Sequence, residues 1–423
     1  MFSIDYDRHR LDNGLTVILS RDEAIPIVAV NLWYGVGSRN ERPGRTGFAH
    51  LFEHMMFQGS AHVPKNRHFE LIERAGGSLN ASTWFDRTNY FETVPSHHLE
   101  LALWLESDRM GWLLPAMTSE KLENQRDVVL NERKQRYENQ PYGDWDERLQ
   151  ALLFPEDHPY HHTVIGSVED IKSASLADVE EFFRTYYVPG NAVLTICGDF
   201  EAERARELVE AYFGEIPEGG VVPPLPGEVE LAPTIGETRK ERVPDSVPLP
   251  RTYLAYRIPP FSDPRFHQAE VAAAVLADGK ASRLYSSLVR ERKLAKDVVA
   301  YAFPLVTGAT MLLVAVTGHA QTEADTLEEA LFEEIEGLSE VRASEVDRAV
   351  ALSETRLVNE VERVGARADL LSLFQTHFDD PGRLNEEMDR LRAVTREDVR
   401  AFAAEFLGPD NRALVTYVPE DER

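Results

Sequence analysis

One stretch near the middle of the chain recurs near its end, and this internal repeat limits the fold more than any other feature. Residues 178–194 read DVEEFFRTYYVPGNAVL, and residues 398–414 read DVRAFAAEFLGPDNRAL, an offset of 220 residues throughout. Each copy predicts a helix, a Pro–Asn turn and a strand. Because the copies close two halves of similar length, the sequence predicts two domains of one fold.

The length of the chain agrees with this division. A chain of 423 residues exceeds one ordinary domain and suits two of about 200 residues. Proline and glycine are frequent in residues 221–250, which we interpret as a linker between a first domain, 1–220, and a second, 251–423. Strand and helix patterns occur in both halves, so we expect an α+β fold with two homologous mixed α/β-layer domains.

The strongest chemical signal is the run HLFEH at residues 50–54. Four residues of an α-helix turn the chain by roughly 400°, so His50 and His54 lie about 40° apart on one face. Two imidazoles placed in this way can bind one zinc ion. Glu53 borders the same face, where it can take a proton from a metal-bound water. The alternative is a core helix with hydrogen-bonded histidines, but a carboxylate between the histidines and a third ligand downstream favour the metal.

The pattern His-x-x-Glu-His, with the motifs that follow it, resembles the pitrilysin family of zinc peptidases, which includes insulin-degrading enzyme and the mitochondrial processing peptidases. The further motifs stand in family order: GGSLNAST at 76–83, TNY at 88–90, NQRDVVLNE at 124–132 and HPY at 158–160. The resemblance implies a zinc metalloendopeptidase that forms half of a clamshell chamber and cleaves extended or unfolded peptides. It also implies an inactive second domain, since His-x-x-Glu-His does not recur there.

A third zinc ligand is expected from the long charged helix predicted over residues 120–139. Glu132 matches the distal glutamate of the family, and a carboxylate that completes two histidines leaves a fourth position for water. Glu123 and Glu138 are the local alternatives, which we interpret as solvated charges. Gln125 stands where many relatives carry a supporting glutamate, and its spacing of seven residues, close to two turns, should make it face the site. We expect one Zn²⁺ per chain.

The segments 79–83 and 88–94 read as paired strands. The resemblance implies that Asn80, Ala81 and Thr83 belong to a sheet edge beside the zinc, where a peptide substrate docks as an added strand. An exposed edge offers unpaired backbone groups to any extended peptide, whatever its side chains. The alternative is an ordinary strand that binds no ligand.

The second domain departs from the family in one respect. In self-sufficient relatives an arginine there, followed two turns later by a tyrosine, holds the substrate carbonyls. Arg290 fits the arginine, but Lys296 or Asp297 stands at the tyrosine position and Tyr301 is too far along the chain. We therefore expect a heterodimer with a homologous partner subunit that lacks the zinc motif, or else a homodimer. The alternative function is a non-catalytic homologous subunit of a peptidase or a larger assembly.

Composition narrows the partners and the compartment. The net charge of −27 would repel nucleic acid and an anionic membrane surface. Cys197 is the only cysteine, so no internal disulfide can form and a reducing compartment is favoured. The sequence has neither a signal-peptide pattern at its start nor an apolar segment long enough to span a bilayer. We therefore expect a cytoplasmic protein.

Overall fold

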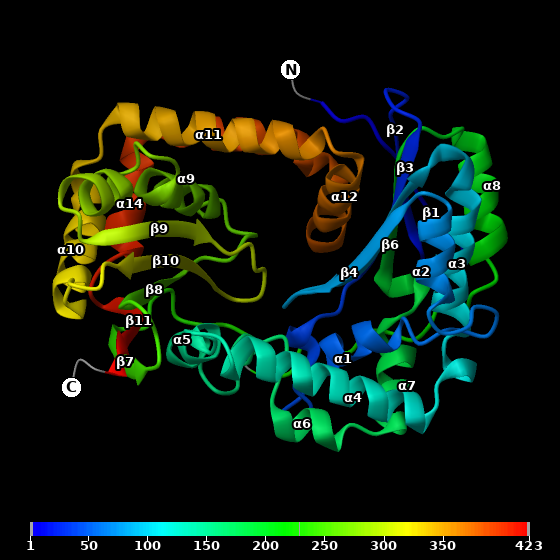
Figure 1. Ribbon diagram of the computed structural model, residues 1–423. Helices are drawn as coiled ribbons and strands as arrows, with labels where there is room; N and C mark the ends of the chain where they lie inside the picture. The colour runs from blue at the N-terminus through cyan, green and yellow to red at the C-terminus, as the bar shows by residue number, and fades with distance from the viewer. Residues whose placement is uncertain (1–2, 228, 421–423) are drawn as a thin grey trace. The chain divides into compact units, whose positions relative to one another are not determined.

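The computed structural model describes residues 3–227 and 229–420, which form two compact units (Figure 1). The first unit contains Met1–Glu132, Thr163–Pro226 and Asn359–Glu386, and the second contains Arg133–His162, Gly227–Val358 and Glu387–Arg423. Each unit therefore includes a segment from the opposite half of the sequence. Whether 1–220 and 251–423 are separate folding domains stays a prediction.

The first unit is built on a six-stranded sheet in the order β1-β2-β6-β3-β5-β4. Its strands are β1 (Asp7–Arg10), β2 (Thr16–Arg21), β3 (Ile27–Tyr34), β4 (Ser78–Thr83), β5 (Thr88–Pro95) and β6 (Ala192–Gly198). A tight turn joins β1 to β2, and Gly14 adopts a φ of 88° there, which glycine tolerates best. β4 pairs antiparallel with β5, as the sequence predicted, and ends the sheet as an edge strand.

Helices lie on both faces of the first sheet (Figure 1). The helices of the first unit are α1 (Phe48–Met55), α2 (Arg67–Arg74), α3 (Leu99–Trp112), α4 (Ser119–Arg133), α6 (Val168–Ser173), α7 (Leu176–Tyr186), α8 (Ala202–Phe213) and α12 (Val364–Phe378). α3 packs on β3 and β5, and α12 packs on β3 and β6. The charged helix predicted over 120–139 is α-helical only to Arg133 and continues as a π-helical segment, Lys134–Glu138.

The second unit repeats this topology with a five-stranded sheet in the order β7-β11-β8-β10-β9. Its strands are β7 (Glu237–Asp245), β8 (Arg251–Ile258), β9 (Ala295–Ala302), β10 (Thr310–Gly318) and β11 (Asn411–Pro419). This order corresponds to β2-β6-β3-β5-β4, with the same parallel first pair and antiparallel remaining pairs. The predicted α+β fold with two homologous mixed layers is confirmed.

The repeated segment itself begins with the same cap in both units. Ser175 caps α7 and exchanges hydrogen bonds with Asp178. Thr395 caps α14 (Arg396–Phe406) and exchanges the equivalent bonds with Asp398. The remaining helices of the second unit are α5 (Trp145–Leu153), α9 (Phe266–Ala277), α10 (Ala324–Glu336) and α13 (Glu387–Ala393). Helix α11 (Ala343–Val361) belongs to the second unit as far as Val358, and its last residues belong to the first.

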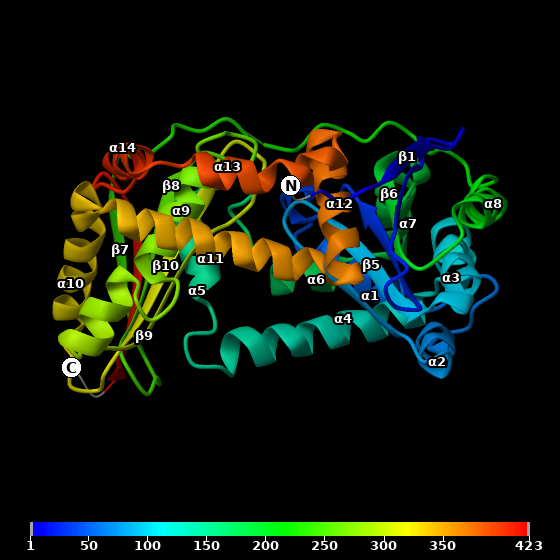
Figure 2. The ribbon, with the colours of Figure 1, turned by 90° about the horizontal axis from the view of Figure 1, so that it is seen from above.

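One helix in each unit comes from the opposite half of the sequence. α12 belongs to the second half but packs on β3 and β6, and α5 belongs to the first half but packs on β8 and β11 (Figure 2). Because β3 and β6 correspond to β8 and β11, the two helices cover equivalent strands. Each half of the sequence therefore contributes one α-helix that packs on the equivalent strands of the other unit. Within the described part of the chain, we find no helix with the length and apolar character needed to cross a lipid bilayer.

Candidate metal centre

Helix α1 carries the His-x-x-Glu-His run, and Glu41 fixes where this helix begins. The buried carboxylate of Glu41 accepts hydrogen bonds from the backbone N–H groups of Gly47 at 2.9 Å and Ala49 at 2.7 Å. Amides at a helix start lack partners within the helix, and a negative charge is favoured there. Gly47 has a φ of 84°, and a Cβ atom would lie 2.4 Å from the carbonyl oxygen of Ile165, so only glycine fits.

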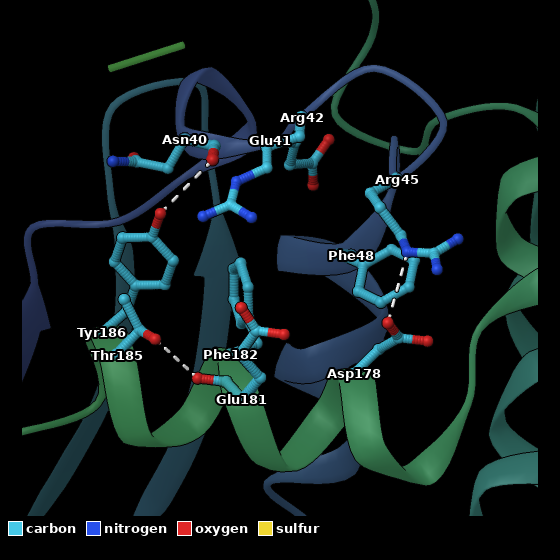
Figure 3. A pocket seen from close by; sticks show the side chains of 10 residues that line it. All are labelled: Asn40, Glu41, Arg42, Arg45, Phe48, Asp178, Glu181, Phe182, Thr185 and Tyr186. Atoms are coloured by element: carbon cyan, nitrogen blue, oxygen red, sulfur yellow. Dashed lines mark hydrogen bonds and ion pairs between the residues drawn. The ribbon is translucent and has the colours of Figure 1, made fainter. Parts of the chain in front are cut away.

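A pocket of about 240 Å³ adjoins this helix start (Figure 3). Arg45 forms an ion pair with Asp178 of α7 at 3.3 Å, and its guanidinium lies 5.8 Å from the ring centroid of Phe48. The hydroxyl of Tyr186 donates to the carbonyl oxygen of Asn40 at 3.4 Å. None of the predicted zinc ligands lines this pocket. The contacts in this pocket join α7 to the loop before α1, so they help to position α1.

The structure brings the three predicted ligands together. Nε2 of His54 lies 3.5 Å from Oε2 of Glu132, and Nε2 of His50 lies 3.8 Å from the same oxygen. One ligand atom from each residue lies within 4.8 Å of the other two. In a tetrahedral zinc site with bonds of about 2.0–2.1 Å, neighbouring ligand atoms are about 3.3–3.4 Å apart. The donor set therefore fits zinc, although the assignment of these residues as ligands stays a prediction.

The charges around these ligands also suit a cation. Burial lowers the pKa of His54, but the hydrogen bond with Glu132 and the negative charge of Glu53 outweigh it, so the pKa is raised. Gln125 is buried and also hydrogen-bonds His54, so its side chain faces these ligands. The side chains of His50, His54 and Glu132 are 13%, 23% and 40% exposed, which leaves the site open to water and substrate.

Glu53 lies beside the ligands and contacts the edge strand. Its carboxylate accepts a hydrogen bond from the hydroxyl of Thr83 in β4. Burial raises the pKa of Glu53, while the Thr83 hydrogen bond and the charges of His54 and Arg87 partly oppose this increase. A carboxylate with a raised pKa is a stronger base, which suits proton transfer near neutral pH.

The edge strand β4 holds the three residues predicted to contact substrate. Among the described strands, β4 pairs only with β5. Asn80 is exposed, and its Oδ1 accepts a hydrogen bond from the backbone N–H of Ala81 at 2.9 Å. Thr83 reaches Glu53, so this strand and the base share one site. Substrate binding by Asn80, Ala81 and Thr83 stays a prediction.

Sequence reasoning did not single out Arg87, which follows β4 in the turn to β5. Its Nη1 donates to the carbonyl oxygen of Ser82 at 2.7 Å and to the Ser82 hydroxyl at 2.6 Å, and its charge acts on Glu53. The sequence feature that could have identified Arg87 is its position as a basic residue between the motifs at 76–83 and 88–90. Sequence reasoning also missed Asp369 of α12, whose carboxylate accepts hydrogen bonds from Trp33 and Asn89. No local pattern indicates which sheet that helix covers.

The alternative ligands lie elsewhere. Glu123 and Glu138 are exposed, and neither belongs to a group of potential metal ligands in residues 3–227 and 229–420. His158 is buried, and its Nδ1 accepts a hydrogen bond from the backbone N–H of Tyr160 at 3.1 Å. It belongs to no such group within the described residues either.

A second acidic cluster occurs in the core of the first unit. His68, Glu92 and Glu106 are buried, with Nε2 of His68 3.2 Å from Glu92 and 3.8 Å from Glu106. Arg109 forms a buried ion pair with Glu106 and lies 4.1 Å from the ring centroid of Tyr90. Because this guanidinium supplies the positive charge that a metal would bring, we interpret the cluster as a structural charge network.

No equivalent group of potential metal ligands occurs in the described residues of the second unit. An offset of 220 residues places Glu270, Ala273 and Ala274 of α9 where His50, Glu53 and His54 stand in α1. The same offset places Leu352 opposite Glu132. The chain therefore carries one His-x-x-Glu-His site on two copies of one fold, an arrangement of the zinc-protease type.

Comparisons with known proteins agree with this class. The family model "Insulinase (Peptidase family M16)" matches residues 16–154, and "Peptidase M16 inactive domain" matches residues 173–352. The chain belongs to the M16 peptidase family. The zinc protease PqqE of Helicobacter pylori is 29% identical over 377 residues, which cover 87% of this chain and 82% of that protein.

Two solved structures show the same fold. The crystal structure of a protease from Helicobacter pylori matches with a TM-score of 0.92 and 26% identity, covering 99% of this chain and 100% of that chain. The crystal structure of the periplasmic protease PqqL from Escherichia coli matches with a TM-score of 0.78 and 18% identity. That match covers 99% of this chain but only 48% of the PqqL chain.

Proposed function

We propose that this chain is a zinc-dependent endopeptidase that cleaves extended or unfolded peptides. The observation that carries the proposal is the convergence of His50, His54 and Glu132 at ligand distances, with Glu53 beside them. The M16 family membership and the name of the relative PqqE support it.

Each residue has a separate role in this proposal. His50, His54 and Glu132 hold the ion, which when bound supplies a Lewis acid that polarises the scissile carbonyl and makes water more acidic. Glu53 takes a proton from the attacking water and later gives it to the leaving amine. Thr83 orients the Glu53 carboxylate, and Gln125 orients the imidazole of His54.

Strand β4 supplies the substrate site in the proposal. A peptide that docks along Asn80–Thr83 would add a strand to the sheet, and the main-chain hydrogen bonds would give affinity with little demand on side chains. Only an extended segment can pair in this way. The expected substrates are therefore unfolded or flexible peptides, and a stably folded protein should resist cleavage.

The decisive experiment separates zinc binding from turnover. Wild-type protein and Glu53→Gln should both bind about one zinc per chain, because Glu53 is not a ligand. Hydrolysis of a labelled unstructured peptide should fall by at least about a hundredfold in Glu53→Gln. Equal turnover in the two proteins would contradict the mechanism. A wild-type protein that binds zinc but shows no turnover with any partner would favour the alternative, a non-catalytic homologous subunit.

We further propose that the active form is a heterodimer with a homologous subunit that lacks the zinc motif, with a homodimer as the alternative. Arg290 is exposed, and its nearest ion-pair partner is Glu291 at 3.7 Å. No tyrosine follows it at the family's spacing. The PqqL chain, of which this chain matches about half, supports an assembly of two such halves.

A further inference from the structure

Asp369 of α12 places a negative charge against the sheet that carries the candidate active site. Its Oδ1 accepts hydrogen bonds from Nε1 of Trp33 at 2.8 Å, Nδ2 of Asn89 at 2.8 Å and Nδ2 of Asn31 at 3.2 Å. The three donors come from β3 and β5, and all three side chains are buried. Three donors therefore converge on one oxygen of this carboxylate.

The network continues from Asn89 to the edge strand. Oδ1 of Asn89 accepts a hydrogen bond from the hydroxyl of Ser82 at 2.7 Å. Arg87 then binds the same residue twice, through its hydroxyl at 2.6 Å and its carbonyl oxygen at 2.7 Å. The Arg87 guanidinium also lies 5.4 Å from the ring centroid of Trp33. One connected set of polar contacts therefore joins α12 to β4.

The charges of Arg87 and Asp369 also act on each other. Burial lowers the pKa of Arg87, and the charge of Asp369 is the largest effect that opposes it. A partly buried guanidinium without a nearby anion is costly, so removal of the Asp369 charge should destabilise the position that Arg87 occupies.

Strand β4 needs such support because it is an edge strand. Among the described strands it has one neighbour, β5, whereas an interior strand has two. Edge strands with one row of backbone partners open more readily than interior strands. The network holds β4 at Ser82, next to the residue whose hydroxyl contacts Glu53. A displacement of β4 would therefore move both the substrate edge and the base.

We propose that Asp369 and Arg87 are positioning residues that hold β4 ready to receive a peptide strand, with the charge supplied by a helix from the opposite half of the sequence. The part of this role that concerns substrate binding rests on the proposed peptidase function. Neither residue touches the reacting atoms, so their effect should appear in substrate binding and in the mobility of β4 more than in the chemical step.

The test uses the full-length protein in Asp369→Asn, which keeps the shape of the side chain but removes its charge. Asp379→Asn is the matched control, since Asp379 caps the same helix and pairs with Arg8 at an exposed position. Hydrogen exchange without substrate should show the β4 amides exchanging about fivefold or more faster in Asp369→Asn, and unchanged exchange in the control. The Michaelis constant for an unstructured peptide should rise about fivefold or more, with a smaller change in kcat.

A second pair of variants covers the case in which Asp369→Asn does not fold. Arg87→Met should show the same two effects, and Arg87→Lys should restore part of the wild-type behaviour, because lysine can still donate to Ser82. Exchange in β4 and Michaelis constants equal to those of the control would overturn the proposal. The hydrogen-exchange measurement does not depend on activity, so it tests the positioning role even if the wild type hydrolyses no peptide. Absence of hydrolysis by the wild type would count against the peptidase function alone.

Discussion

Thr83 donates a hydrogen bond from its hydroxyl to the carboxylate of Glu53, so the edge strand and the proposed base are in direct contact. Thr83 is the last residue of β4, and Glu53 lies in α1. In the proposed function, a peptide that pairs with β4 would therefore reach the position where the proposed base acts. Positioning of this kind contributes strongly to rate, since misplacement by about 1 Å can cost on the order of a hundredfold.

Replacement of Thr83 by valine tests this contact. Thr83→Val keeps the β-branched shape but removes the donor, so Glu53 loses its orientation and kcat should fall about tenfold. Thr83→Ser keeps the hydroxyl and should retain most of the activity. Steady-state kinetics on one peptide compares the two variants. A serine variant as impaired as the valine variant would mean that the methyl group, and not the hydrogen bond, is what matters.

Removal of each predicted ligand should release zinc. His50→Ala, His54→Ala and Glu132→Ala should each lose most of the metal, because two remaining protein ligands hold zinc far more weakly than three. Zinc content after gel filtration gives the measurement. Glu123→Gln serves as the control, since Glu123 is exposed on the same helix and should not affect the metal. Full zinc in Glu132→Ala would show that the third ligand is another group.

Local patterns were sufficient to predict the elements around α1. The period of the helix placed His50 and His54 on one face, and two alternating runs predicted β4 and β5 as a pair. Glu132 was different, because its position 78 residues after His54 carries no local signal. Its assignment depended on the family resemblance, and the structure then placed it within ligand distance.

The exchanged helices could not be predicted from the sequence. α5 and α12 have apolar faces that could cover either sheet, and periodicity does not say which sheet a helix reaches. The contact between Asp369 and Trp33 joins residues more than 300 positions apart, so it depends on tertiary packing alone. The π-helical segment after Arg133 was also missed, because its sequence continues the charged helical pattern.

Acid should destabilise the protein partly through His158. Burial lowers the pKa of His158 from 6.5 to about 4. Between these values the unfolded chain binds a proton that the folded chain excludes, so the free energy of unfolding falls as the pH decreases. The contribution is complete above pH 6.5 and is lost by about pH 4, with a maximum of about 3 kcal/mol.

A substitution isolates this contribution. His158→Asn provides an acceptor for the backbone N–H of Tyr160 but does not titrate, so it should flatten the loss of stability between pH 6.5 and 4. Urea unfolding at several pH values measures the slopes. The variant is expected to be less stable than wild type at pH 7 because the ring contact with Phe154 is lost. A slope identical to that of wild type would assign the acid sensitivity to other groups.

The proposed heterodimer makes the last prediction. The first unit carries the candidate zinc chemistry, but the second unit lacks a tyrosine at the family's spacing from Arg290. A zinc subunit without those contacts can still polarise a carbonyl, yet it holds the substrate poorly. The missing contacts can come from a homologous subunit that has lost zinc and kept the arginine and tyrosine. Activity should therefore be weak in the isolated chain and rise by about a hundredfold when that partner is added.

The same experiment distinguishes the homodimer. Mixing the chain with a homologous protein that lacks His-x-x-Glu-His should produce one larger species on a sizing column, together with the gain in activity. Arg290→Ala in this chain should then have little effect, because the partner supplies the contacts to substrate. If the isolated chain is fully active as a homodimer, and Arg290→Ala reduces that activity, the heterodimer proposal is wrong and Arg290 itself binds substrate.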